Sequence, residues 1–230
     1  MRPRIFLFDI DLTMIRTNGA GSAAMEATVR EMLGVSDAFA GMRFAGRTDR
    51  AILREALTRC GRLDNGFDRF CTEFEARYLH HLHRELAVRN GVVLPGVPEL
   101  LDAVAALPGA RLGLATGNFR RAAEAKLRHF GLWGRFRDGG FAEDGEERAD
   151  LVAAAVARVG AGASHPAVVY VIGDSTHDVQ AAKAHGLVAV GVCTGECAAD
   201  ELWAAGADLV FPDLSAPDDV LGRLLRLADG

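Results

Sequence analysis

The stretch Ile5-Phe6-Leu7-Phe8-Asp9-Ile10-Asp11-Leu12-Thr13 sets the fold class of this 230-residue chain. Its first four residues form an unbroken apolar run that ends in an acid, as expected for a buried strand of a parallel sheet. Four further short apolar runs follow, at 111–115, 168–172, 187–192 and 208–211. Helical patterns separate these runs, and alternating strands and helices predict an α/β fold with a parallel sheet.

Proline and glycine mark the helices between these strands. The predicted helix at 98–107 starts with Pro98, which suits a first turn because its missing N–H would have no partner there. The helices at 119–130 and 180–185 are followed by Gly131 and Gly186. Glycine readily adopts the left-handed conformation that ends a helix, so both boundaries are well marked.

The alternation breaks between residues 17 and 90, where helices are predicted at 22–33, 49–60 and 68–86 and no strand pattern is found. The third helix carries an apolar face formed by Phe67, Phe70, Phe74, Tyr78 and Leu82. That face is most simply the core of the helical segment itself. We therefore predict an α/β core made of residues 1–16 and 91–230, with residues 17–90 inserted as an all-helical cap.

Composition argues against several classes of function. The chain has 26 basic and 31 acidic residues, a net charge of −5, whereas nucleic-acid-binding domains usually carry clustered positive charge. No apolar run approaches the roughly 18 residues that a membrane span needs, and the run at 5–8 is too short for a secretory signal. Four cysteines are too few for a disulfide scaffold. We expect a cytoplasmic monomer or homodimer without nucleic-acid or membrane partners, with a short flexible loop at 160–164.

Four acids lie where predicted strands end. Asp9 and Asp11 follow the first strand, and Asp174 and Asp178 follow the strand at 168–172. Open α/β sheets bind ligands at this edge. Asp9 and Asp11 alone could form a solvated turn, but several carboxylates gathered at one buried edge would be costly without a counter-ion. Oxygen ligands in this number favour Mg²⁺, bound together with a substrate phosphate.

A third strand end carries Thr116-Gly117-Asn118. It supplies a hydroxyl group and a glycine whose backbone N–H can approach an anion closely, just before a helix begins. By itself this triplet could equally be a plain helix cap.

Together these segments resemble the motifs of the haloacid dehalogenase superfamily of phosphohydrolases. Asp9 to Thr13 match its D-x-D-x-T motif, Thr116 its Ser/Thr motif, and Gly173 to Asp178 its acidic G-D-x-x-x-D motif. The helical insertion follows the first motif, as the family's cap does. The resemblance implies a Rossmann-like core and Mg²⁺ as cofactor. Leu12 departs from the pattern, because many members have glycine there.

The family also needs a cation, usually a lysine, between the second and the last motif. Lysine is scarce in this chain, which has only Lys126 and Lys183. Lys126 lies within the helix after Thr116, among arginines, where we expect a solvated face, and Lys183 follows the last motif. Arg148, at the start of the helix before the strand at 168–172, is the better match. A surface arginine at a charged helix start would fit the same residues.

The resemblance implies a role for each residue. Asp9 would attack phosphorus and form an aspartyl-phosphate, and Asp11 would act as general acid and then as general base. Thr116, Arg148 and backbone N–H groups would hold the phosphoryl oxygens. The expected metal site consists of Asp9, the backbone carbonyl of Asp11, Asp174, and Asp178 acting indirectly or through water. The expected substrate-binding residues are Thr13, Gly117, Asn118 and Arg47.

In the cap, Gly46-Arg47-Thr48-Asp49 resembles the G-R-T-D segment of phosphoglycolate phosphatase-like and β-phosphoglucomutase-like members. Arg47 could contact a substrate anion, or Thr48 could simply cap the next helix with Arg47 on the surface. A metal site at His80, His81 and His83 is not favoured, and we assign no role to His177.

The leading hypothesis is a Mg²⁺-dependent phosphatase of a small phosphorylated metabolite, with a phosphoglycolate-like phosphomonoester as substrate. A phosphomutase of the β-phosphoglucomutase type is the alternative. A non-hydrolytic phospho-accepting module is disfavoured by the helical insertion and the order of the D-x-D-x-T motif. Halide displacement is disfavoured because the family's dehalogenases lack an acid at the position of Asp11. Phosphonate cleavage would need a cap lysine, and residues 17–90 contain none.

Overall fold

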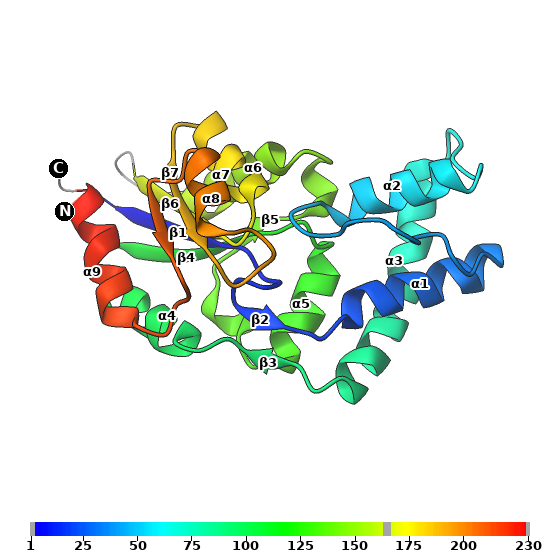
Figure 1. Ribbon diagram of the computed structural model, residues 1–230, viewed down its shortest axis with the longest axis horizontal. Helices are drawn as coiled ribbons and strands as arrows, with labels where there is room; N and C mark the ends of the chain where they lie inside the picture. Colours follow the sequence, from blue (N-terminus) through cyan, green and yellow to red (C-terminus); the bar gives the residue numbers. More distant parts are fainter. Residues whose placement is uncertain (1–2, 163–166, 229–230) are drawn as a thin grey trace.

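The computed structural model describes residues 3–162 and 167–228, and within them a parallel sheet forms the core. Its strand order is β5-β4-β1-β6-β7-β8. The strands are β1 (Arg4–Phe8), β4 (Ala110–Ala115), β5 (Gly139–Gly140), β6 (Val168–Gly173), β7 (Val188–Val192) and β8 (Leu209–Phe211). Figure 1 shows these strands at the centre of one lobe, with helices on both faces. The predicted α/β class is therefore confirmed.

The strand order reverses at β1, which pairs with β4 on one side and with β6 on the other. Phe8 at the end of β1 is in register with Leu114 of β4 and Ile172 of β6. The backbone N–H of Asp9 extends this pairing by donating to the Ile172 carbonyl at 2.9 Å. The residues that follow the three strands therefore meet at one edge, where open α/β sheets place their ligand sites.

Successive residues of β1 point to opposite faces of the sheet, and both faces are buried. Phe6 and Phe8 belong to the apolar cluster that includes Leu100 and Leu224, while Ile5 and Leu7 belong to the cluster that includes Val152 and Val179. This burial explains why the strand reads as an unbroken apolar run rather than an alternating one. The core helices are α4 (Val97–Ala105), α5 (Arg120–His129), α6 (Arg148–Gly160), α7 (Thr176–Ala184), α8 (Ala199–Ala204) and α9 (Pro217–Ala228), with 3-10 turns at Trp133–Arg135 and Ala142–Asp144.

The helix boundaries agree with the proline and glycine signals. Pro98 lies in the first turn of α4, and Gly131 and Gly186 have φ values of 71° and 64° just after α5 and α7. Helix α7 begins earlier than predicted, because the Ser175 side chain accepts a hydrogen bond from the Asp178 backbone N–H. This cap places Asp178 inside the first turn of the helix rather than in a loop.

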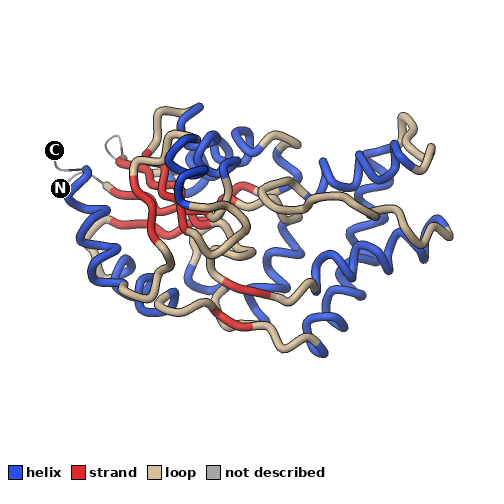
Figure 2. Tube along the Cα trace, viewed as in Figure 1, coloured by secondary structure: helices blue, strands red, loops and turns tan. Residues whose placement is uncertain are grey.

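A second lobe holds the helices α1 (Ala20–Leu33), α2 (Asp49–Arg59) and α3 (Phe67–Val88). Figure 2 shows it as helices and loops to one side of the sheet. The chain leaves the core through β2 (Ile15–Arg16) and returns through β3 (Val92–Val93), which pair antiparallel. Phe74 and Tyr78 of α3 are buried, and their apolar cluster continues onto Phe119 and Ala122 at the start of α5. The division of the chain at residues 16/17 and 90/91 stays a prediction.

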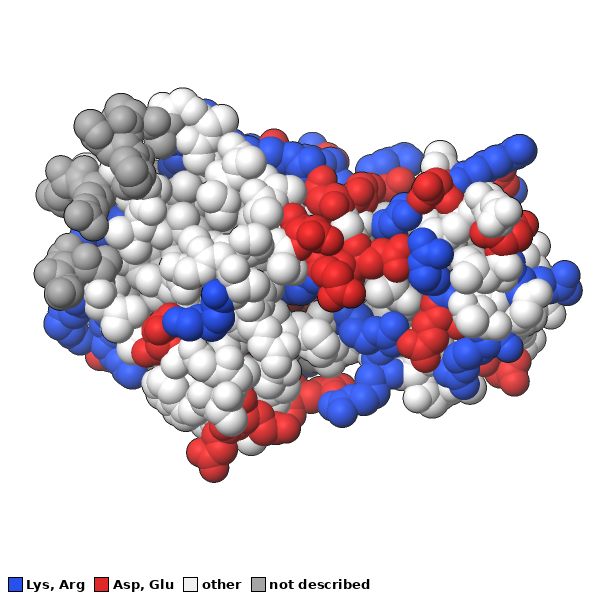
Figure 3. All heavy atoms as spheres, turned by 90° about the horizontal axis from the view of Figure 1, so that it is seen from above, with Lys and Arg blue, Asp and Glu red and all other residues white. Residues whose placement is uncertain are grey.

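The surface agrees with the charge balance of the sequence. On the face shown in Figure 3, acidic and basic side chains are mixed, and much of the core lobe is free of charge. Among the described residues, no helix is both long enough and apolar enough to cross a membrane. The flexible loop expected at 160–164 lies partly outside the described residues.

Candidate active site

Asp9 and Asp11 occupy the turn that follows β1. Asp9 is 7% exposed, whereas the Asp11 side chain is 36% exposed. Leu12 lies between Asp11 and Thr13, and its φ of 60° is in the left-handed region. That conformation is natural for glycine and costs another residue roughly 1–2 kcal/mol. Here the Thr194 hydroxyl holds the turn by donating to the Leu12 carbonyl at 2.5 Å.

Arg148 is buried against Asp9. Its Nη2 atom lies 2.8 Å from Asp9 Oδ1, and the Arg148 side chain is 6% exposed. The same guanidinium donates to Asp178 Oδ1 from Nε at 2.9 Å and from Nη2 at 2.5 Å. Arg148 is the first residue of α6, so the helix start aims the side chain at the end of β1. The sequence left a surface arginine open as an alternative, and the burial excludes it.

Asp174 and Asp178 follow β6 but have different surroundings. Asp174 Oδ1 accepts the Thr13 hydroxyl at 3.1 Å, and a side chain at Gly195 would collide with Asp174 Oδ2. Asp178 has both oxygens engaged, because Oδ1 accepts from Arg148 and Oδ2 accepts the Ser175 hydroxyl at 2.6 Å. Asp178 therefore orients Arg148, which agrees with an indirect role at a metal.

The site fits a divalent cation. Oxygens of Asp9, Asp174 and Asp178 lie within 4.8 Å of one another, and all three residues are buried. With the single positive charge of Arg148, three carboxylates leave two negative charges uncompensated. Burial raises the pKa of Asp9 to about 6 and, together with the charges of Asp9 and Asp178, raises that of Asp174 to about 8. A hard dication bound by carboxylate oxygens would remove this conflict.

The end of β4 brings Thr116, Gly117 and Asn118 to the same edge. Thr116 is fully buried and its hydroxyl accepts from Asn118 Nδ2 at 2.8 Å. Asn118 Nδ2 also donates to Asp11 Oδ2 at 2.8 Å. Thr13 is likewise fully buried. Of the four residues expected to bind substrate, Gly117, Asn118 and Arg47 line the cavity described below, whereas Thr13 supports Asp174 from behind.

The expectation that Lys126 lies on a solvated face is wrong. Lys126 is 4% exposed, and its Nζ lies 2.6 Å from both Asp11 Oδ2 and Asn118 Oδ1. It stands on the buried face of α5 one turn after Ala122, and helical side chains lean back toward the helix start. The one available signal was its position four residues after an apolar residue. The neighbouring arginines made the whole helix look exposed, so this position was not recognised as buried.

The cap closes one side of the site through residues 46–49. A Cβ at Gly117 would lie 2.3 Å from the Arg47 carbonyl oxygen, and one at Gly46 would lie 2.5 Å from His177 Nδ1. Thr48 caps α2 by accepting the Ala51 N–H at 3.1 Å, so the helix cap that the sequence suggested at this residue is present. Arg47 is one of the residues that line the cavity, and its guanidinium pairs with Glu55 at 2.8 Å.

Asp49 is a site residue that the sequence analysis did not single out. Its backbone N–H donates to the Gly117 carbonyl at 2.7 Å, and its Oδ2 accepts the Phe119 N–H at 2.9 Å. Burial raises the pKa of Asp49 to about 7, and Lys126 opposes this shift. A buried carboxylate of the cap is thus fixed to the loop that carries Asn118.

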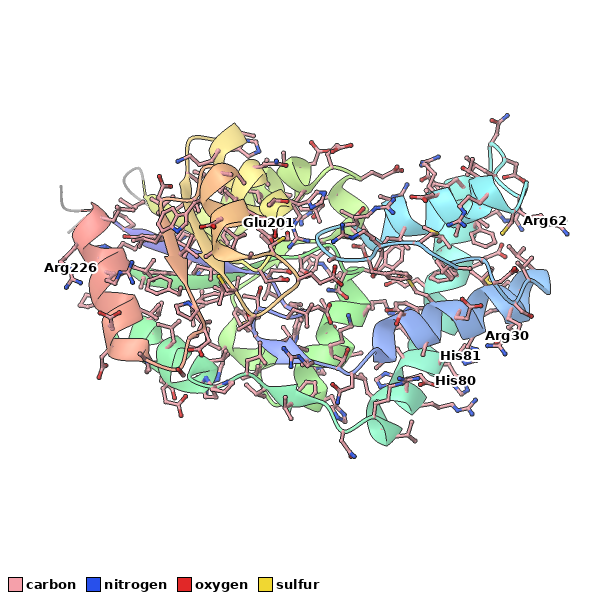
Figure 4. The ribbon with its side chains drawn as sticks, in the orientation of Figure 1. Arg30, Arg62, His80, His81, Glu201 and Arg226 are labelled. Carbon is pink, nitrogen blue, oxygen red and sulfur yellow. The ribbon has the colours of Figure 1, made fainter. Side chains whose placement is uncertain are left out.

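The histidines of α3 lie far from this site. Figure 4 places His80 and His81 on the outer part of the cap, away from the sheet. His81 Nε2 lies 2.7 Å from Glu31, and His80 and His83 are exposed. Within residues 3–162 and 167–228, no metal-ligand group of three or more involves them, since the group found there is Asp9, Asp174 and Asp178.

A cavity of about 440 Å³ lies between the core and the cap. Asp9, Asp11, Lys126 and Arg148 line it from the core, and cap residues such as Asp49 and Tyr78 line it from the other side. Its size suits a small molecule. Asp9, Asp11 and Arg148 therefore face a space that the cap partly encloses, whereas Thr116 is not among the lining residues.

A parallel α/β core with acids at the ends of β1 and β6, covered by a helical cap, defines a capped hydrolase of the haloacid dehalogenase type. Residues 3–186 match the family model of haloacid dehalogenase-like hydrolases. The chain belongs to this family, as its sequence motifs suggested, and is a hydrolase.

Several proteins are similar over nearly the whole chain. The probable phosphatase IndB of Dickeya dadantii (strain 3937) is 29% identical, over 99% of this chain and 97% of that protein. A hydrolase from Pseudomonas syringae has the same fold, with a TM-score of 0.69 and 22% identity over 97% of this chain and 99% of that one. CbbY from Rhodobacter sphaeroides, solved in complex with phosphate, has a TM-score of 0.65 and 22% identity, over 94% and 96%.

Proposed function

We propose that this hydrolase is a Mg²⁺-dependent phosphatase of a small phosphomonoester, of the phosphoglycolate type, acting through an aspartyl-phosphate on Asp9. The contact of Asp9 with Arg148 at 2.8 Å, on the wall of the cavity, carries this proposal. A transferring phosphoryl group is anionic, so a carboxylate can attack it only where positive charge is already in place. The similarity to a probable phosphatase supports the same reaction.

In the first step an Asp9 oxygen attacks phosphorus and the bond from phosphorus to the ester oxygen breaks. The electron pair of that bond goes to the departing oxygen, which takes a proton from Asp11. Asp11 suits this task because it faces the cavity two residues from Asp9. It is also more exposed than Asp9, Asp174 and Asp178. Arg148 and the hydroxyl of Thr116 are proposed to hold the phosphoryl oxygens.

In the second step a water molecule gives a proton to Asp11 while its oxygen attacks the phosphorus of the aspartyl-phosphate. The bond between phosphorus and Asp9 breaks, phosphate leaves, and both acids return to their starting states. One difficult hydrolysis is thereby divided into two easier steps that use the same acid in opposite senses.

Asp9, Asp174 and the backbone carbonyl of Asp11 are the proposed ligands of Mg²⁺. When bound, Mg²⁺ supplies positive charge that offsets the carboxylates and the phosphoryl oxygens. Thr13 fixes Asp174 through its hydroxyl, and Asp178 keeps Arg148 directed at Asp9. These two residues act by orienting their neighbours.

The cavity limits the substrate to a small metabolite, and Arg47 is proposed to meet a second anionic group on it. Arg47 lines the cavity from the cap, and Glu55 holds its guanidinium. Replacing Arg47 by Ala should therefore raise KM for phosphoglycolate more than for a phosphomonoester whose alkyl group carries no charge.

The test is phosphate release from a panel of phosphomonoesters, measured with Mg²⁺ and with EDTA. We expect turnover only with Mg²⁺, and none from Asp9→Asn. Asp218→Asn, which changes an exposed acid on α9, should behave as the original protein. Turnover by Asp9→Asn at the original rate would disprove the mechanism. Formation of an isomerised sugar phosphate without free phosphate would establish the mutase alternative instead.

A further inference from the structure

A buried lysine is attached to the proposed general acid. Lys126 Nζ lies 2.6 Å from Asp11 Oδ2, and the lysine side chain is 5% exposed. Asn118 Nδ2 donates to the same Asp11 oxygen at 2.8 Å, and Asn118 Oδ1 accepts from Lys126 at 2.6 Å. Three polar side chains thus form a closed triangle in which both donors meet at Asp11 Oδ2.

The cap covers this triangle. A Cβ at Gly21 of α1 would lie 3.3 Å from Lys126 Nζ and 3.5 Å from the hydroxyl oxygen of Tyr78 on α3. The backbone of α1 therefore approaches the ammonium group closely at Gly21. The ammonium group comes from the core, and α1 of the cap lies against it at Gly21.

Stability alone does not account for this arrangement. Burying an ammonium group costs several kcal/mol before its partners compensate, and replacing a buried ion pair by apolar groups is often neutral or stabilising. Lys126 also differs from Lys183, which is 41% exposed and pairs with Asp208 on the surface. A buried charge directed at a reacting group requires a chemical explanation.

We propose that Lys126 is a positioning residue for Asp11, an inference that rests on the proposed function. Lys126 and Asn118 occupy Oδ2, which leaves Oδ1 of the same carboxyl group to carry the transferred proton. As the O–H bond of Asp11 breaks and the proton moves to the departing oxygen, negative charge develops on the carboxyl group. The ammonium group is already in place to meet that charge, so no reorganisation is needed at that moment.

This role differs from that of Arg148. Arg148 contacts Asp9 and Asp178 and is proposed to hold the oxygens of the transferring phosphoryl group, whereas Lys126 contacts Asp11 and Asn118. Loss of Arg148 should therefore slow the reaction of every phosphate ester. Loss of Lys126 should slow mainly those esters whose departing oxygen needs a proton.

The test compares two esters of similar shape, phenyl phosphate and 4-nitrophenyl phosphate, by their kcat/KM, which reports the steps up to release of the phenol. Phenol is a much poorer leaving group than 4-nitrophenol and needs the general acid more. We expect Lys126→Met to lower kcat/KM for phenyl phosphate roughly ten- to hundredfold more than for 4-nitrophenyl phosphate. Lys183→Met, the matched change at the exposed lysine, should alter neither value.

Asp11→Asn is the reference, and it should show the same selectivity for the poorer leaving group. The double variant Asp11→Asn with Lys126→Met should be no slower than Asp11→Asn alone, because Lys126 acts through Asp11. If Lys126→Met does not fold, as judged by circular dichroism, Lys126→Gln gives the same comparison with a smaller loss of packing.

Equal losses for both esters in the lysine variant would overturn the inference, as would losses that multiply in the double variant. If Asp11→Asn is itself unselective, Asp11 is not the general acid and the inference falls with that assignment. Failure of the whole proposed function is recognised separately, by turnover in Asp9→Asn.

Discussion

Arg148 Nη2 lies 2.8 Å from Asp9 Oδ1 at the carboxyl end of β1, and both side chains are less than one-tenth exposed. Removing one partner of a buried ion pair leaves the other charge uncompensated. Around Asp9 the effect is greater, since Asp174 and Asp178 add two further carboxylates within 4.8 Å. The stability of the site therefore depends on this single guanidinium.

Arg148→Ala should lower the free energy of unfolding by about 3–5 kcal/mol in the absence of Mg²⁺ and abolish turnover. Arg148→Lys should also lose most activity, because one ammonium group cannot reproduce the paired contacts to Asp9 and Asp178. Urea unfolding and phosphate release measure the two effects. Arg226→Ala, at an exposed position on α9 that Figure 4 labels, should change neither. Unchanged stability in Arg148→Ala would contradict the burial argument.

The response of the protein to Mg²⁺ should depend on pH. Burial raises the pKa of Asp9 to about 6 and that of Asp174 to about 8. A raised pKa means that the folded state binds protons more tightly than the unfolded state. The protonated acids therefore stabilise the folded state at low pH, and this contribution is lost as the pH rises through the folded pKa values of about 6 and about 8. The cation binds the ionised acids, and its stabilisation should grow over the same range.

At a Mg²⁺ concentration of about 100 times Kd, cation binding should add roughly 2.7 kcal/mol at pH 8. For a chain of this size that corresponds to a rise in Tm of roughly 5–10 °C, with a smaller rise at pH 6. Thermal unfolding with and without Mg²⁺ measures both. Asp174→Asn should lose most of the effect, and an equal rise at the two pH values would argue against these acids as ligands.

The sequence predicted much of the fold, because its main strands are buried on both faces and read as apolar runs. It did not predict β5, since Gly139 and Gly140 have no apolar side chains. A Cβ at Gly140 would lie 1.8 Å from the Leu151 carbonyl oxygen, so glycine is needed here for the strand to pack closely against α6. Such long-range contacts leave no local pattern.

The same distinction applies to the site. Asp9, Asp11 and Asp174 could be found because each directly follows a strand, and strand ends meet at one edge of the sheet. Lys126 was placed wrongly, because its contact with Asp11 joins segments that are far apart in the sequence. Asp49 could not be identified either, because its contacts with Gly117 and Phe119 form only when the cap packs against the core.

Asp49→Asn should stabilise the protein at alkaline pH. Burial raises the pKa of Asp49 to about 7, so its contribution to stability is present at low pH and is lost as the pH rises through 7. An amide cannot ionise and can still accept the Phe119 N–H. We expect a gain of roughly 1–4 kcal/mol at pH 8 and a clearly smaller gain at pH 5, measured by urea unfolding. A gain of equal size at both pH values would show that ionisation is not the cause.

Gly117→Ala should separate the cap from the core at the site. A methyl group there would lie 2.3 Å from the Arg47 carbonyl oxygen and 3.0 Å from Arg148 Nη1, and a backbone atom cannot move aside cheaply. We expect a loss of about 1–3 kcal/mol in unfolding free energy. We also expect a fall in kcat/KM, because the displaced segment carries Arg47 and Asp49. Gly134→Ala is the control, since a methyl group there meets open space. If Gly117→Ala matches this control in stability and in turnover, the contact between cap and core at Arg47 does not hold the site together.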